Sequence, residues 1–171
     1  MNKTERIREI NELMKKLQAE LCTLNPYAGL KSMGNKEFGE SWSEKWIIQH
    51  CPAFVREDGK GYDFRSENLG KVEVKSSRVP NSGLTFNQVH PYDCDYFLFV
   101  VYNTEEGTEE LFLFPSKAIF DGEIKINAQH VRPEDKNKIP ECGTISGTKK
   151  NMTVLEEKYK ISSWEELNGK A

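Results

Sequence analysis

The stretch Gly61-Tyr62-Asp63-Phe64-Arg65-Ser66-Glu67-Asn68-Leu69-Gly70-Lys71-Val72-Glu73-Val74-Lys75-Ser76-Ser77 decides how this sequence folds. Apolar and polar side chains alternate on both sides of a polar segment at residues 66–70, which predicts two short strands joined by a turn. In the second strand, Val72 and Val74 share the buried face. The charged side chains of that strand, Lys71, Glu73 and Lys75, then share the opposite face.

A five-residue turn at 66–70 pairs Arg65 with Lys71 and places Asp63 directly across from Glu73. A shift of the register by one residue would separate the two carboxylates. Opposed carboxylates repel each other, so a cation must compensate them. Lys75 is one such partner, and a hard divalent cation such as Mg²⁺ is another. The simpler alternative is a solvated strand face with weak surface ion pairs.

Length and composition indicate one globular domain spanning residues 1–171, with 37% apolar and 30% charged residues. Its net charge of −3 gives no overall attraction to nucleic acid or anionic lipid, although a local basic groove stays compatible with it. The longest apolar run, residues 96–102, is too short to cross a bilayer, and the first twenty residues are highly charged. We therefore expect a cytoplasmic protein without a membrane partner.

Apolar residues spaced by three and four predict an amphipathic helix at about residues 3–22. Packing on the core is the simpler interpretation of this helix, and a dimer contact is the alternative. A second helix is expected at about residues 36–50, with Phe38, Trp42 and Trp46 on its core-facing side. The run at 96–102 predicts a central strand beside residues 111–114. From about residue 128 to residue 171 the chain reads as an irregular C-terminal region, in which Ser162 or Ser163 could cap a last short helix at residues 164–167.

Together these segments predict an α/β fold, in which helices flank a central mixed sheet of about five strands. Within it, the sequence resembles the PD-(D/E)XK, or restriction-endonuclease-like, nuclease superfamily. The resemblance lies in Phe38-Gly39-Glu40 on a helix, Asp63 at a strand start, Glu73-Val74-Lys75 on the next strand and the apolar strand that follows. It covers about residues 36–114 of an expected catalytic core at 36–127. Gly61-Tyr62 stands where the motif name has Pro before Asp, so the match is loose at that point.

The resemblance implies that Asp63 and Glu73 bind Mg²⁺, for which Mn²⁺ may substitute, with the backbone carbonyl of Val74 as a further ligand. Lys75 would be the catalytic lysine. Glu40 would be the auxiliary acid, although Glu44 and Glu37 share its helical stripe.

The implied function is a Mg²⁺-dependent DNA endonuclease, most simply a type II restriction enzyme that cuts a short double-stranded site. It would act as a homodimer, with a companion DNA methyltransferase. A structure-selective repair or recombination nuclease and a catalytically silent nucleic-acid-binding module are the alternatives. Donor side chains suited to phosphates and base edges follow the motif and recur near the C-terminus: Ser76, Ser77, Arg78, Asn81, Asn87, Gln88, Lys149 and Lys150.

Overall fold

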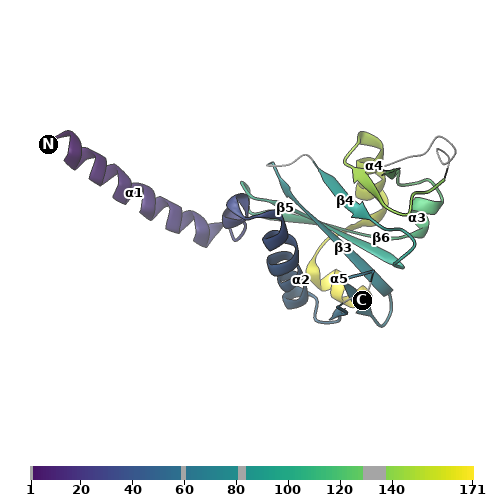
Figure 1. The fold of residues 1–171 in the computed structure, drawn as a ribbon. Helices are drawn as coiled ribbons and strands as arrows, with labels where there is room; N and C mark the ends of the chain where they lie inside the picture. The colour runs from purple at the N-terminus through teal and green to yellow at the C-terminus, as the bar shows by residue number, and fades with distance from the viewer. Residues whose placement is uncertain (1, 59–60, 81–83, 129–137) are drawn as a thin grey trace.

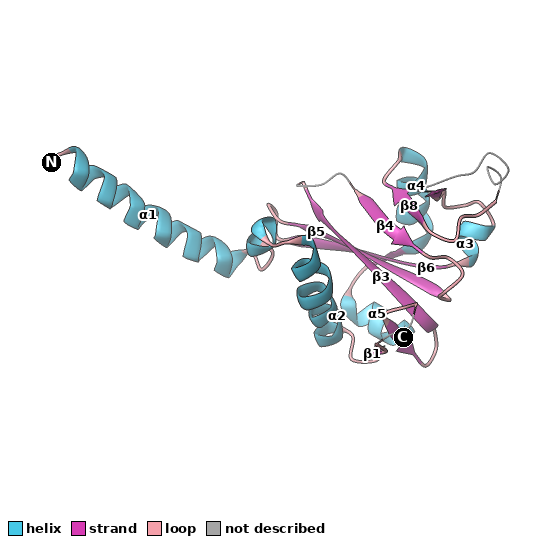
Figure 2. Cartoon of the chain, in the orientation of Figure 1, coloured by secondary structure: helices cyan, strands magenta, loops and turns pink. Residues whose placement is uncertain are grey.

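The computed structural model describes residues 2–58, 61–80, 84–128 and 138–171, which form an α/β fold around a six-stranded mixed sheet (Figures 1 and 2). β3 and β5 run parallel, whereas the other neighbouring pairs of this sheet are antiparallel. The predicted mixed sheet is confirmed, with six strands in place of about five. In spatial order its strands are β1 (Val55–Arg56), β2 (Phe64–Ser66), β3 (Gly70–Val79), β5 (Tyr96–Asn103), β6 (Thr108–Pro115) and β9 (Lys160–Ile161).

A second sheet of three strands lies against the first and has the order β4 (Thr85–Val89), β8 (Gly143–Ser146) and β7 (Asn127–Ala128). Residues 123–126 form no strand, and regular pairing begins at Asn127. The helical segments are α1 (Lys3–Leu24), η1 (Ala28–Ser32), η2 (Glu37–Ser43), α2 (Glu44–His50), α3 (Lys117–Phe120), α4 (Lys149–Val154), η4 (Leu155–Tyr159) and α5 (Trp164–Lys170).

The central strand β5 separates two apolar cores, which explains its uninterrupted hydrophobicity. Leu98 and its neighbours on one face pack with α2 and α5. Phe97 and Phe99 on the other face pack with side chains of the second sheet and α4–η4. The predicted central position of this strand is confirmed, since β3 and β6 pair with its two edges. The aromatic stripe Phe38, Trp42 and Trp46 also packs in the first core, as expected.

The hairpin of β2 and β3 has the predicted register. Arg65 pairs with Lys71 and Ser66 pairs with Gly70, so residues 67–69 form the turn. Gly70 has a φ of +74°, a backbone conformation that glycine adopts without the strain of a side chain. The N–H group of the next residue, Lys71, donates to Asp95 Oδ2 at 2.9 Å. Because Asp95 directly precedes β5, this bond fixes the end of the turn beside the start of β5.

The C-terminal region expected to be irregular contains regular structure in its described part, so that prediction was wrong, whereas the last short helix is confirmed as α5 with Ser163 as its cap. β8 joins the second sheet, β9 extends the main sheet, and α5 packs on the first core. The last residue also returns to the hairpin turn, where the Ala171 carbonyl oxygen accepts hydrogen bonds from Ser66 Oγ at 2.8 Å and from Asn68 N at 3.1 Å. Residues 129–137 lie outside the described part.

The first helix, α1, forms as predicted but does not pack on the core, so the simpler interpretation of its apolar stripe was wrong. It has no buried residue and projects away from the body of the molecule (Figure 1). Asn2 and Glu5 form the capping box at its start, with mutual hydrogen bonds of 2.8 and 2.9 Å. None of the helices in the described ranges has the length and apolarity needed to cross a membrane.

Candidate functional site

Asp63 lies directly before β2, where the register of the hairpin ends with Phe64 opposite Val72. Asp63 N–H donates to the Val72 carbonyl oxygen at 3.2 Å, and Asp63 Oδ2 accepts a hydrogen bond from Val74 N–H at 2.8 Å, which fixes one of its two oxygens. The Asp63 carboxyl group also interacts with that of Glu73, so the structure brings the two predicted carboxylates together.

Glu73 is buried, and its side chain is only 9% exposed. Burial raises the pKa of this carboxyl to about 7, Lys75 lowers it, and the nearby Asp63 raises it further. Lys75 Nζ donates a short hydrogen bond to Glu73 Oε1 and is itself 19% exposed. A buried carboxylate, a second carboxylate and an ammonium group thus occupy one small volume.

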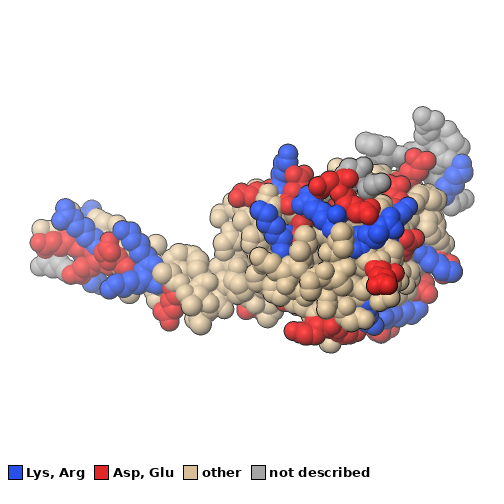
Figure 3. Space-filling view, turned by 90° about the horizontal axis from the view of Figure 1, so that it is seen from below, with Lys and Arg blue, Asp and Glu red and all other residues tan. Residues whose placement is uncertain are grey.

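Asp63 and Lys75 line a cleft of about 570 Å³, and the hydrogen bond from Lys75 connects this cleft to the buried Glu73. The cleft runs along β3 beyond the part that pairs with β2, between η2 on one side and β4 on the other. Acidic and basic side chains lie side by side on the face drawn in Figure 3, so that face presents no broad patch of one sign. The cleft is lined by Asn35, Phe38, Gly39, Glu40, Ser43, Glu44, Asp63, Val74, Lys75, Ser76, Ser77, Arg78, Thr85, Phe86, Asn87 and Gln88.

The structure distinguishes between the candidate auxiliary acids. Glu40 lines the cleft, but its side chain is 63% exposed and lies 3.9 Å from Lys36. Glu44 is 13% exposed, and Arg56 from β1 holds it at 2.7 Å. Burial raises the pKa of Glu44, Arg56 lowers it, and Asp63 raises it, so Glu44 interacts with the Asp63 carboxylate of the pair. Glu37 is exposed and does not line the cleft.

The donor set of the pair fits a Mg²⁺ ion. Val74 N–H points to Asp63, and the N–H and C=O of one strand residue point to the same side, so the Val74 carbonyl also faces the pair. No group of three or more His, Cys, Asp or Glu side chains that could hold a metal occurs among the described residues. Mg²⁺ needs only one or two carboxylates, because it retains several waters and binds substrate phosphates.

The predicted DNA-binding residues divide into two groups. Asn87 and Gln88 are exposed on β4 and face the cleft, and Gln88 has a φ of 54° at an irregularity of the strand. Lys149 and Lys150 are exposed on α4 and do not line the cleft. Asn81 lies outside the described residues.

The three residues that follow Lys75 line the cleft and also hold the fold together. Ser76 Oγ lies 2.5 Å from Ser43 Oγ, and Ser77 is buried. Arg78 donates to the carbonyl oxygens of Leu30 and Met33 and stacks 4.6 Å from the Phe38 ring centroid. Arg78 thereby connects β3 to η1 and to the start of η2.

Three residues of the site were not predicted: Thr85 and Phe86, which line the cleft, and Arg56, which pairs with Glu44 beside it. Arg56, which holds Glu44, comes from a two-residue strand that gives no functional signal in the sequence. Thr85 and Phe86 line the cleft because their strand, β4, lies next to β3. Neither a scan against protein-family models nor a search of curated proteins found a match for this chain.

Proposed function

We propose that this protein is a Mg²⁺-dependent DNA endonuclease that hydrolyses phosphodiester bonds within a short double-stranded site, as type II restriction enzymes do. The observation that carries the proposal is the contact of the buried Glu73 with both Lys75 and Asp63, two residues that line a cleft. The resemblance of these residues to the PD-(D/E)XK superfamily supports it.

In this proposal Asp63, Glu73 and the Val74 carbonyl would hold the ion. When bound, Mg²⁺ would polarise a phosphoryl oxygen and lower the pKa of a bound water. The Lys75 ammonium group stabilises negative charge that develops on the phosphate oxygens, and it orients the attacking water. Glu44 adds a third carboxylate at the edge of the pair and would be the auxiliary acid. Glu40 suits this role less well, because its side chain is exposed.

The cleft walls suit a nucleic-acid backbone and base edges. Asn87 and Gln88 present amide donors and acceptors from β4, opposite the wall formed by η2. A homodimer would cut both strands of a palindromic site, and a companion DNA methyltransferase would protect the same site.

The decisive experiment is incubation of plasmid and phage DNA with the protein in Mg²⁺, in Mn²⁺ and in EDTA. We expect discrete fragments with either metal and none in EDTA. Asp63→Asn and Lys75→Ala should each reduce the cleavage rate at least about 100-fold. Lys71→Ala is the matched control, because this lysine is exposed on the same strand outside the cleft and should leave the rate unchanged.

Other results would select the alternatives. Cutting confined to branched or mismatched DNA would identify a repair or recombination nuclease. If no DNA or RNA substrate is cut in either metal, a catalytically silent binding module becomes the leading interpretation, and a gel-shift assay on the same substrates measures its binding.

A further inference from the structure

The apolar residues of α1 follow a heptad pattern. Ile7, Met14 and Leu21 lie seven residues apart, and an apolar residue follows each of them by three positions. Alternating spacings of three and four place all six on one stripe of the helix, as at the a and d positions of a coiled coil. The second set consists of Ile10, Leu17 and Leu24.

This stripe is exposed to solvent. Its six side chains are between 43% and 75% exposed, and Leu13 beside them is 57% exposed. Seven of the ten exposed large apolar side chains in the described ranges lie on this one helix. A concentration of apolar surface on one projecting element indicates an interaction surface.

We propose that α1 pairs with α1 of a second copy of this chain in a coiled coil, which joins two molecules into a dimer. The a and d stripe supplies both the knobs and the holes of such a seam, so an identical helix is its natural complement. This inference does not depend on the proposed nuclease activity.

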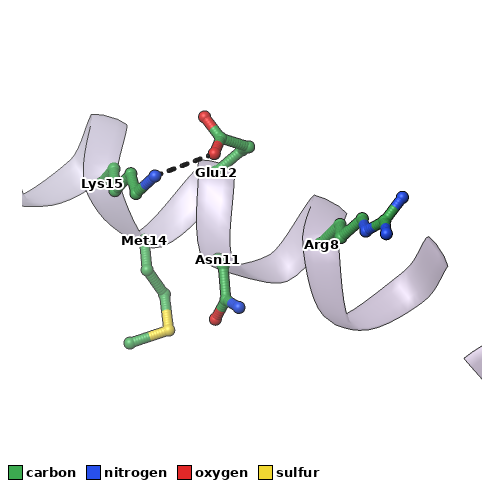
Figure 4. Close-up of a pocket in the computed structure, with 5 residues that line it drawn as sticks. All are labelled: Arg8, Asn11, Glu12, Met14 and Lys15. Carbon is green, nitrogen blue, oxygen red and sulfur yellow. Dashed lines mark hydrogen bonds and ion pairs between the residues drawn. The ribbon is translucent and has the colours of Figure 1, made fainter. Parts of the chain in front are cut away.

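The charges of the helix favour a second copy over a membrane surface. α1 has five basic and four acidic side chains, so it neither repels an identical helix nor attracts anionic lipid strongly. Figure 4 shows Met14 on one side of the helix and the Glu12–Lys15 ion pair, at 3.0 Å, on another. The hollow drawn there, of about 410 Å³, is lined by residues of α1 alone.

The size of the surface also fits. The 22 residues of α1 extend over about 33 Å, at 1.5 Å per residue. Covering the seven exposed side chains would bury on the order of several hundred Å² per helix, approaching the roughly 800 Å² per partner of a standard interface. Most of the stability of a helix in a protein comes from packing of its apolar face, so pairing also stabilises α1 itself.

Sedimentation velocity of the full chain, without DNA or metal, tests the proposal. Between about 1 and 100 µM the wild type should sediment as a dimer of its 19.7 kDa chain. Leu17→Lys should raise the dimer dissociation constant at least about 100-fold, because it places a charge in the seam. Ala19→Lys adds the same charge on the opposite face of α1 and should remain dimeric.

Both variants should keep the near-UV circular dichroism and the unfolding midpoint of the body, since α1 has no buried residue and no aromatic residue. A wild type that is monomeric at about 100 µM would overturn the proposal. The same holds if Leu17→Lys stays dimeric or if both lysine variants dissociate alike. A monomeric wild type that co-sediments with phosphatidylserine vesicles would assign the stripe to a membrane.

Discussion

Glu73 is the residue on which the site depends. Its carboxyl group lies between the Lys75 ammonium group and the Asp63 carboxyl group, in a part of the protein from which water is largely removed. Burial disfavours its charged form, whereas Lys75 favours it, and burial has the larger effect. Without a further cation, ionised Glu73 therefore destabilises the fold.

This balance predicts how stability varies with pH. Burial raises the pKa of Glu73 from 4.5 to about 7, so the folded protein favours the protonated carboxyl group. The stability that this protonated group contributes is fully present below pH 4.5 and is lost as the pH rises through 7. In EDTA, the free energy of unfolding of Glu73→Gln should rise relative to that of the wild type by on the order of 1–3 kcal/mol when the pH is raised from 5 to 8. Urea unfolding at the two pH values measures this gain.

Glu67→Gln is the matched control, because Glu67 is an exposed glutamate in the adjoining turn. It should show the pH dependence of the wild type. If Glu73→Gln also follows the wild type across this range, the carboxyl group is not buried as the structure places it.

At the scale of elements, the turn of the hairpin controls the site. Gly70 has a positive φ, and a Cβ atom added there would lie 2.5 Å from Asp95 Oδ2. Gly70→Ala should therefore destabilise the protein by about 1–3 kcal/mol, measured as a lower urea midpoint at constant m-value. Cleavage should fall with it, because the turn sets the pairing of Asp63 with Glu73.

Gly169→Ala provides the comparison for this substitution. Gly169 lies in α5, where an added Cβ meets nothing within 4 Å, so alanine should be neutral or stabilising by a few tenths of a kcal/mol, on the order of its helix propensity advantage. Equal effects of the two substitutions would contradict the assigned turn geometry.

The sequence was sufficient to predict the hairpin because alternation and turn length together fix a register. It was also sufficient for β5, whose length and uniform hydrophobicity require cover on both faces. It could not identify Glu44, because Glu40 and Glu44 are equivalent on a helical stripe. Only Arg56, brought from another element, distinguishes them.

The same limits explain the two main errors of prediction. Amphipathicity shows that α1 has an apolar face but not which surface covers it. In the C-terminal region, β8 has four residues and β9 has two, too few to produce a recognisable period among prolines and glycines. Their pairing comes from tertiary contacts with β4 and β6.

At the scale of the whole molecule, α5 links the end of the described chain to the site-bearing hairpin. Leu167 is fully buried in the first core, and Asn168 Oδ1 accepts a hydrogen bond from Ala53 N–H at 3.2 Å. Leu167→Ala should cost about 2–4 kcal/mol in the free energy of unfolding, by loss of buried area and formation of a cavity. Urea denaturation measures this loss.

Val55→Ala is the control for this truncation, since Val55 is 63% exposed on β1 and should change stability by less than about 0.5 kcal/mol. A near-neutral Leu167→Ala would mean that α5 is not part of the core.

The return of Ala171 to the hairpin turn has a consequence for synthesis. Ser66 and Ala171 are separated by 105 residues, so the ribosome releases the hairpin about 5 to 20 s before the segment that anchors it. A nascent or prematurely terminated chain would carry both carboxylates without their anchor. In the proposed nuclease, the hairpin that carries the site would then be anchored only when translation has passed α5.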